Sequence, residues 1–266
     1  MTNEIKHLSF SSMHKLSDEP KVFYDRYINH NRENFWSEAM TIGVIVHSWI
    51  EGYYKGNKDI GTKKKEIQAY CYKKLDKKRE EYISRLEDWE EPDEYDKHKM
   101  VRMMYKAINN FLQTTDNISK PKDSEYQIYT ELCEEDIKYK GYIDAVYADY
   151  ILDYKIVKNF WDLDDWYAGK NKSKYWWQGL FYCVWYSLQE ETSINTAKFL
   201  EIKKSKPRTT AAVRMITFHY TEEDFERCID EFKKSCNIAK ELTMDSLLEK
   251  FDNGDESIKY SVEELL

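Results

Sequence analysis

The segment Gly141-Tyr-Ile-Asp-Ala-Val-Tyr-Ala-Asp-Tyr-Ile-Leu-Asp-Tyr-Lys155 predicts two apolar strands joined by a tight polar turn. Asp144 lies on the first strand, and Asp153 and Lys155 lie on the second. Side chains alternate between the two faces of a strand, so Asp153 and Lys155 point to the same side. The hairpin therefore brings acidic and basic groups together among apolar neighbours.

The charges of the second strand are unusual because its other residues are apolar. Burying an ionisable pair in such a strand costs free energy unless something compensates the charge. A divalent cation would do so, since two carboxylates from neighbouring strands are hard oxygen ligands suited to Mg²⁺ or Mn²⁺. A surface ion pair is the alternative, and the spacing of this hairpin alone does not choose between them.

Four short motifs follow one another along the chain: Gly43-Val-Ile-Val-His47, Gly141-Tyr-Ile-Asp144, Asp153-Tyr-Lys155 and Gln178-Gly-Leu-Phe-Tyr182. In type and order they resemble the core of the PD-(D/E)XK nuclease superfamily, in particular its RecB-like and phage-exonuclease branch. The four motifs together are far more specific than any one of them. The resemblance extends over roughly residues 8–220.

The resemblance implies metal-dependent hydrolysis of phosphodiester bonds in DNA, exonucleolytic rather than endonucleolytic, leaving a 5′-phosphate. It implies these ligands for Mg²⁺ or Mn²⁺: the side chains of His47, Asp144 and Asp153 and the main-chain carbonyl of Tyr154. Lys155 would orient or activate the attacking water. Gln178 and Tyr182 would face the active site, and a buried amide–phenol hydrogen bond between them is compatible with that role.

Relatives of this branch often carry one more glutamate on the strand before Asp144. Residues 125–133 alternate as such a strand, and Glu125 and Glu131 point to the same polar side. We favour Glu131 and leave Glu125 open.

The fold class that these elements predict is α/β, a restriction-endonuclease-like core with a central mixed sheet of about five strands flanked by helices. Apolar residues recur at helical spacing over 38–54 and 173–189. Gly43 and His47 share one face of the first helix, and Gly43 would let that helix approach the sheet. We expect the metal site where strands 141–148 and 151–157 diverge.

We expect one nuclease domain over residues 1–266, with a helical insertion at about 58–118. Two amphipathic helices are predicted there, over 60–90 and 95–114. They form either an arm that walls a substrate channel or an exposed helical hairpin.

The net charge of −8 is at odds with a nucleic-acid enzyme, which normally shows a basic footprint. Lysines do gather near the candidate site, and the run Lys203-Lys-Ser-Lys-Pro-Arg208 would either contact DNA or form a solvated surface. Trp161 and Trp166 would either stack on bases or pack against the core.

The five cysteines are scattered and match neither a disulfide framework nor the iron–sulfur pattern of some relatives, so we expect no cluster. No apolar run approaches the ~18 residues of a membrane span, and the N-terminus has no apolar signal segment, so we expect a cytoplasmic protein.

Two other functions compete with a nuclease: a catalytically silent nuclease-like module that binds nucleic acid or protein, and a metal-dependent phosphohydrolase acting on small nucleotides. Retention of every acidic and basic motif position argues against the first, and the clustered lysines favour a polymeric substrate over the second. By analogy alone, a single-strand annealing protein is a candidate partner and a homo-oligomer is a candidate assembly.

Overall fold

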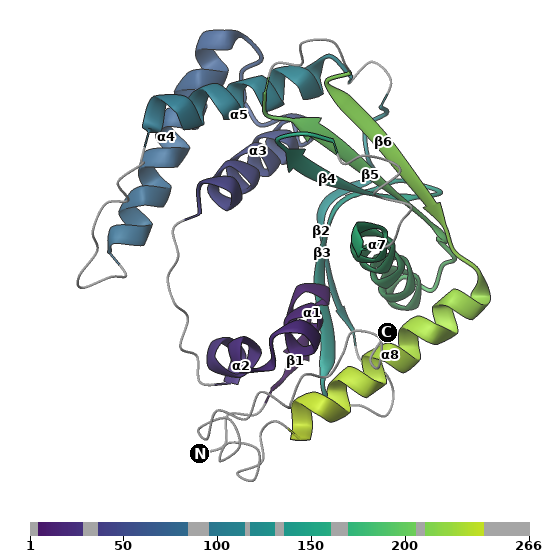
Figure 1. Cartoon of the computed structure of the whole chain (residues 1–266). Helices are drawn as coiled ribbons and strands as arrows, with labels where there is room; N and C mark the ends of the chain where they lie inside the picture. The colour runs from purple at the N-terminus through teal and green to yellow at the C-terminus, as the bar shows by residue number, and fades with distance from the viewer. Residues whose placement is uncertain are drawn as a thin grey trace.

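The computed structural model describes residues 5–28, 37–84, 96–114, 118–130, 136–160, 170–205 and 211–241 (Figure 1). The helices are α1 (Phe10–Asp18), α2 (Pro20–Phe23), the π-helix η1 (Tyr24–Ile28), α3 (Glu38–Tyr54), α4 (Lys64–Ile83), α5 (Lys97–Leu112), α7 (Lys170–Gln189) and α8 (Glu222–Glu241). The strands are β1 (His7–Leu8), β2 (Asp123–Thr130), β3 (Lys138–Val146), β4 (Ile151–Val157), β5 (Thr196–Lys203) and β6 (Val213–His219).

The six strands form one mixed sheet in the order β1-β3-β4-β5-β6, with β2 also paired to β3. The β1–β3 and β4–β5 pairs are parallel, and the β2–β3, β3–β4 and β5–β6 pairs are antiparallel. The predicted α/β fold with a mixed sheet flanked by helices is confirmed. The sequence did not predict the strand β1, because two residues are too short to show a period.

Strands β3 and β4 stay paired over only a short distance. Their paired residues are Ala145 with Leu152 and Val146 with Ile151. Beyond the Ala145–Leu152 pair the two strands separate, and this is the point at which Asp144 and Asp153 lie. The two strands diverge where the metal site was expected, and the site itself stays a prediction.

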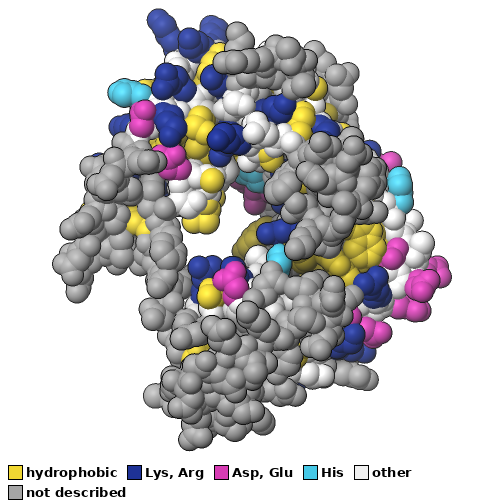
Figure 2. Space-filling view, viewed as in Figure 1, with side chains coloured by type: hydrophobic (Ala, Val, Ile, Leu, Met, Phe, Trp, Pro, Cys, Tyr) yellow, Lys and Arg dark blue, Asp and Glu magenta, His cyan; other side chains and the backbone are white. Residues whose placement is uncertain are grey.

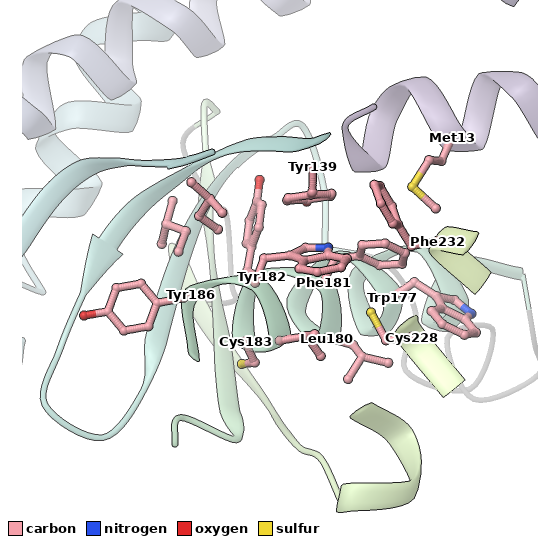
Figure 3. Packing of buried hydrophobic residues seen from close by; sticks show 14 of the residues in the cluster. Met13, Tyr139, Trp177, Leu180, Phe181, Tyr182, Cys183, Tyr186, Cys228 and Phe232 are labelled. Carbon is pink, nitrogen blue, oxygen red and sulfur yellow. The ribbon is translucent and has the colours of Figure 1, made fainter. Parts of the chain in front are cut away.

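One face of the sheet is covered by α7, with α8 packed against α7 (Figures 1 and 3). The aromatic side chains of α7 and α8 fill this layer, and Phe181, Trp185 and Phe232 are almost completely buried. Tyr139 of β3 stacks on Phe181 and on Trp185 with centroid distances of 5.6 and 5.3 Å. The helix predicted over 173–189 is therefore present and packs against the sheet.

The opposite face of β4 and β5 is covered by α3 and α5, with α4 packed on both of these helices. Phe111 of α5 is completely buried and meets Tyr154 of β4 edge-on at 5.8 Å. Met104 and Ile108 are buried in the same cluster as Leu152 and Leu200 of the sheet. The second helix of the expected insertion is thus part of the core and not an exposed hairpin.

Among the helices that the structure describes, none combines the length and the apolar character needed to cross a bilayer.

Candidate active site

Helix α3 places His47 against the diverging strands. Ser37 caps the helix by accepting a hydrogen bond from the Met40 amide, and Ile45, Val46 and Trp49 are buried beneath it. His47 lies at the edge of this buried face, where its Nδ1 is 3.2 Å from Asp144 Oδ1. The other Asp144 oxygen accepts a 2.7 Å hydrogen bond from the Tyr154 amide, so both carboxylate oxygens have partners.

Glu125 joins His47 and Asp144 in a group of three candidate metal ligands. One ligand atom from each of these residues lies within 4.8 Å of the other two. The pairs Ser124–Ala145 and Tyr126–Ile143 flank Glu125 and place it opposite Asp144 in the β2–β3 ladder. Glu125 has φ of 54°, a left-handed conformation that is uncommon for a glutamate. The backbone is therefore strained at the residue that completes the group.

The charged groups of these three residues lie close together and shift one another's pKa values. Burial, together with the nearby Asp144 and Glu51 carboxylates, raises the pKa of Glu125 to about 7. Burial alone would lower the pKa of His47, but the adjoining Asp144 carboxylate outweighs it and raises that pKa to about 9. Burial likewise opposes ionisation of Asp144, and the neighbouring His47 and Tyr154 amide hold its pKa below the usual value.

A second set of polar groups lies on the α7 side of β4. Lys155 Nζ is 2.7 Å from Asp153 Oδ2 and donates a 3.0 Å hydrogen bond to Gln178 Oε1. The Gln178 amide nitrogen lies 3.2 Å from Asp153 Oδ1 and 2.8 Å from the Tyr182 hydroxyl oxygen. Burial raises the pKa of Asp153, although the Lys155 ammonium opposes this. Gln178 thus connects the acid, the base and the phenol.

Three further residues, which were not expected from the sequence, form a polar group next to Lys155 in the sheet. Glu201 of β5 is Lys155's partner in the β4–β5 register and is completely buried. Arg214 Nε donates a 2.8 Å hydrogen bond to Glu201 Oε2, and Tyr175 OH lies 3.4 Å from the other Glu201 oxygen. The sequence did offer a signal for Glu201: it is a carboxylate within the mostly apolar strand 196–202, just as Asp153 is a carboxylate within an apolar strand.

The structure brings together His47, Asp144, Asp153, Lys155, Gln178 and Tyr182 as the candidate site. Tyr154 contacts it through its amide, and the role of its carbonyl stays a prediction. Glu131, which the sequence analysis favoured, lies outside the described residues, as do Trp161 and Trp166. The alternative, Glu125, meets His47 and Asp144.

Two expectations about neighbouring residues are wrong. A Cβ at Gly43 would meet nothing within 4 Å, so this glycine is not required for close approach of α3 to the sheet. Lys203 and Lys204 are mostly buried, so they do not form the solvated surface that was one of the two expectations for the run 203–208. Residues 206–208 of that run lie outside the described residues. Lys203 Nζ lies 4.1 Å from the centre of the Phe160 ring, which explains its burial by packing.

The residues present fit a divalent cation. The Glu125 and Asp144 carboxylates and the His47 imidazole converge. The strained backbone at Glu125 holds its carboxylate close to that of Asp144, although the two repel each other. Carboxylate oxygens suit Mg²⁺ and Mn²⁺, and one imidazole is compatible with a first-row divalent ion. With Lys155 beside Asp153, the arrangement combines a cation site with a fixed ammonium, which is suited to binding and hydrolysing a phosphate ester.

The model of the PD-(D/E)XK nuclease superfamily matches residues 7–253 of the chain. Six solved protein chains are similar in structure, among them the crystal structure of a "putative exonuclease" from Eubacterium rectale. That protein is 12% identical, with a TM-score of 0.54, and the match covers 88% of this chain and 82% of the other. At this identity the likeness establishes the fold alone. No curated protein matches the chain.

Proposed function

Because the chain belongs to the PD-(D/E)XK nuclease superfamily, we propose that it is a metal-dependent deoxyribonuclease that digests DNA from its ends. The observation that carries the proposal is the convergence of His47, Glu125 and Asp144 beside the Asp153–Lys155–Gln178 set. Assignment to the RecB-like and phage-exonuclease branch is part of the proposal. It is supported by His47 and Gln178, which meet the acidic residues of the hairpin from opposite sides of the sheet.

In this proposal His47, Glu125 and Asp144 hold the cation, and Asp153 reaches it from the neighbouring strand. A bound Mg²⁺ or Mn²⁺ would polarise the phosphate and favour ionisation of a water molecule. The Lys155 ammonium, held by Asp153 and Gln178, is placed to bind a phosphate oxygen or to orient the attacking water. Gln178 contacts both Lys155 and Asp153 from α7. Its hydrogen bond to Tyr182, one turn further along the same helix, holds the Gln178 amide in position.

The buried Glu201–Arg214 pair supports the same geometry. Glu201 lies next to Lys155 in the sheet, and an unpaired carboxylate there would compete with Asp153 for the ammonium. Arg214 Nη2 lies 2.6 Å from Glu201 Oε2 and neutralises it. Lys155 therefore remains directed toward Asp153 and Gln178, where the proposed chemistry takes place.

The experiment that tests the proposal uses linear double-stranded DNA labelled separately at its 5′ and 3′ ends, beside a covalently closed circle. The wild-type protein is compared with Asp153→Asn, and with Asp149→Asn as a matched control on the exposed turn of the same hairpin. We expect Mg²⁺- or Mn²⁺-dependent loss of the linear DNA only. Asp153→Asn and a chelator should abolish this loss, and Asp149→Asn should retain it.

Three results would contradict this proposal in different ways. Equal cutting of the circle would identify an endonuclease. Binding of DNA without cutting in either metal, by a protein that unfolds cooperatively, would favour the silent binding module. Turnover of free nucleotides without cutting of DNA would favour the small-substrate phosphohydrolase.

A further inference from the structure

A cavity of about 730 Å³ lies between α1, η1, β3 and α7, beside the candidate active site. Gln178 and Tyr182 line it, so it shares a wall with the group that holds Asp153 and Lys155. Its volume falls in the range of about 300–1,000 Å³ that is typical of small-ligand sites. Figure 2 shows the molecule hollowed on this face, with lysine and arginine side chains along the border of the hollow.

The lining of the cavity is basic, although the whole chain is acidic. The charged residues that line it are Lys15, Glu19, Arg26, Lys140 and Lys174. Lys15 and Glu19 are paired with each other, which leaves an excess of three positive charges from Arg26, Lys140 and Lys174. A concave surface with this excess attracts a polyanion, even on a protein with a net charge of −8.

The serine hydroxyls at this cavity already have partners within α1. Ser9 Oγ accepts a hydrogen bond from the Ser12 amide, and Ser12 Oγ accepts one from the Ser9 amide, which completes a capping box. The three basic side chains, and not these hydroxyls, are therefore the groups available to bind phosphates.

Tyr142 adds an aromatic face to the basic cavity. It is 48% exposed and lines the cavity, and it precedes Asp144 by two residues on the same side of β3. Exposed tyrosines are common, and Tyr129 on β2 is 45% exposed without lining the cavity. What distinguishes Tyr142 is its position between basic side chains and the candidate metal ligands.

Resting on the proposed nuclease function, we propose that this cavity binds a single-stranded end of the DNA substrate next to the bond that is cut. Tyr142 stacks on a base, and Arg26, Lys140 and Lys174 bind backbone phosphates. Aromatic faces beside a basic groove are the usual means of binding single strands without sequence preference. A continuous duplex keeps its bases stacked on one another, so Tyr142 would have no base face to contact.

The test measures binding of a short fluorescent oligothymidine by anisotropy, in chelator and over a series of salt concentrations, so that no cutting occurs. We expect Tyr142→Ala to weaken binding by about 5- to 150-fold, the loss for one stacked base, and Tyr142→Phe to bind like the wild type. Tyr82→Ala, at a half-buried tyrosine of α4 that does not line the cavity, is the control and should bind normally. Each variant is checked for an unchanged unfolding temperature.

Salt dependence separates the stacking role from the phosphate-binding role. Lys140→Gln should reduce the slope of log K against log salt by about 0.7, as expected for one phosphate contact on a single strand. Tyr142→Ala should leave this slope unchanged. Lys233→Gln on α8, at a half-buried lysine like Lys140, is the control and should change neither the affinity nor the slope.

Three outcomes would overturn the inference: no binding of the single strand by the wild type, equal binding by Tyr142→Ala, or binding of a blunt duplex that Tyr142→Ala weakens to the same extent. None of these outcomes bears on the nuclease proposal, which the cutting of labelled DNA tests separately. Failure of the nuclease proposal has a different signature, since single-strand binding that depends on Tyr142 would then occur without any metal-dependent cutting.

Discussion

Glu125 is held in a left-handed conformation that costs a non-glycine residue about 1 kcal/mol or more. Such strain persists when the surroundings fix the residue, and it is concentrated at functional sites. Here the β2–β3 register fixes Glu125 opposite Asp144, in reach of His47. The strain therefore supports Glu125, and not Glu131, as the extra acidic ligand.

We expect Glu125→Gln to weaken Mn²⁺ binding by about tenfold or more, because it removes one of the charged ligands that set the affinity of such a site. Isothermal titration of the metal-free protein with Mn²⁺ measures the change. Glu131→Gln is the comparison, and it should bind Mn²⁺ like the wild type. A loss confined to Glu131→Gln would return the assignment to that residue.

The pKa values of His47 and Glu125 predict how the stability of the metal-free protein depends on pH. The His47 pKa is raised from 6.5 to about 9, so its contribution is complete below pH 6.5 and is lost as the pH rises through 9. The Glu125 pKa is raised from 4.5 to about 7, so the stability associated with its protonated form is lost as the pH rises from 4.5 to 7. Both groups therefore destabilise the metal-free protein as the pH increases.

Metal ligands must be deprotonated to bind, so Mg²⁺ should stabilise the protein more at about pH 8.5 than at about pH 6. Thermal unfolding with and without Mg²⁺ at the two pH values measures this difference. His47→Gln should flatten the loss of metal-free stability between about pH 6.5 and pH 9. A stabilisation by Mg²⁺ that is equal at both pH values would contradict the assignment of these ligands.

At the scale of elements, two glycines in helices have opposite surroundings. A Cβ at Gly179 of α7 would lie 2.7 Å from Ala197 Cβ and would also collide with the Tyr220 hydroxyl. The Tyr220 hydroxyl is itself fixed by a 2.9 Å hydrogen bond to the Trp176 carbonyl. Because Gly179 has no side chain, α7 can pack closely on β5. A Cβ at Gly43 of α3 would instead enter open space.

We expect Gly179→Ala to destabilise the protein by about 1–3 kcal/mol through overpacking. Gly43→Ala should stabilise it by about 0.5–1 kcal/mol, because alanine is the better helix former and nothing obstructs its methyl group. Denaturant unfolding of the two variants, on the same wild-type baseline, measures both changes. A loss of stability in Gly43→Ala would mean that α3 approaches a neighbour at this residue after all.

For the molecule as a whole, the sequence predicts which residues form the site better than it predicts how they meet. Strand alternation pairs Asp153 with Lys155, and the resemblance adds His47 and Gln178. Alternation cannot choose between Glu125 and Glu131, because it predicts the same side for both. The β2–β3 register places Glu125 opposite Asp144, and Glu131 lies outside the described residues. Strand length decided which strands could be predicted. Five strands are long enough to show a period of two, and β1, with two residues, is not.

The position of α5 depends on tertiary packing that its sequence does not specify. Its amphipathic pattern predicts a buried face, but the same pattern fits a separate arm as well as a layer of the core. In the structure Phe111 meets Tyr53, Tyr54 and Tyr154 edge-on, with centroid distances of 6.2, 5.9 and 5.8 Å. Tyr154 follows Asp153 directly, so α5 supports the strand that carries the candidate site.

Phe111→Ala tests whether residues 58–118 unfold together with the sheet. We expect a loss of about 3–5 kcal/mol in a single cooperative transition, because this ring is completely buried between α3 and β4. Arg102→Ala, at an exposed position of the same helix, should change stability by no more than about 0.5 kcal/mol. Denaturant unfolding followed by far-ultraviolet circular dichroism and by tryptophan fluorescence reports both variants. A separate early transition in Phe111→Ala, with the main one unchanged, would instead identify a helical arm that folds independently of the nuclease core.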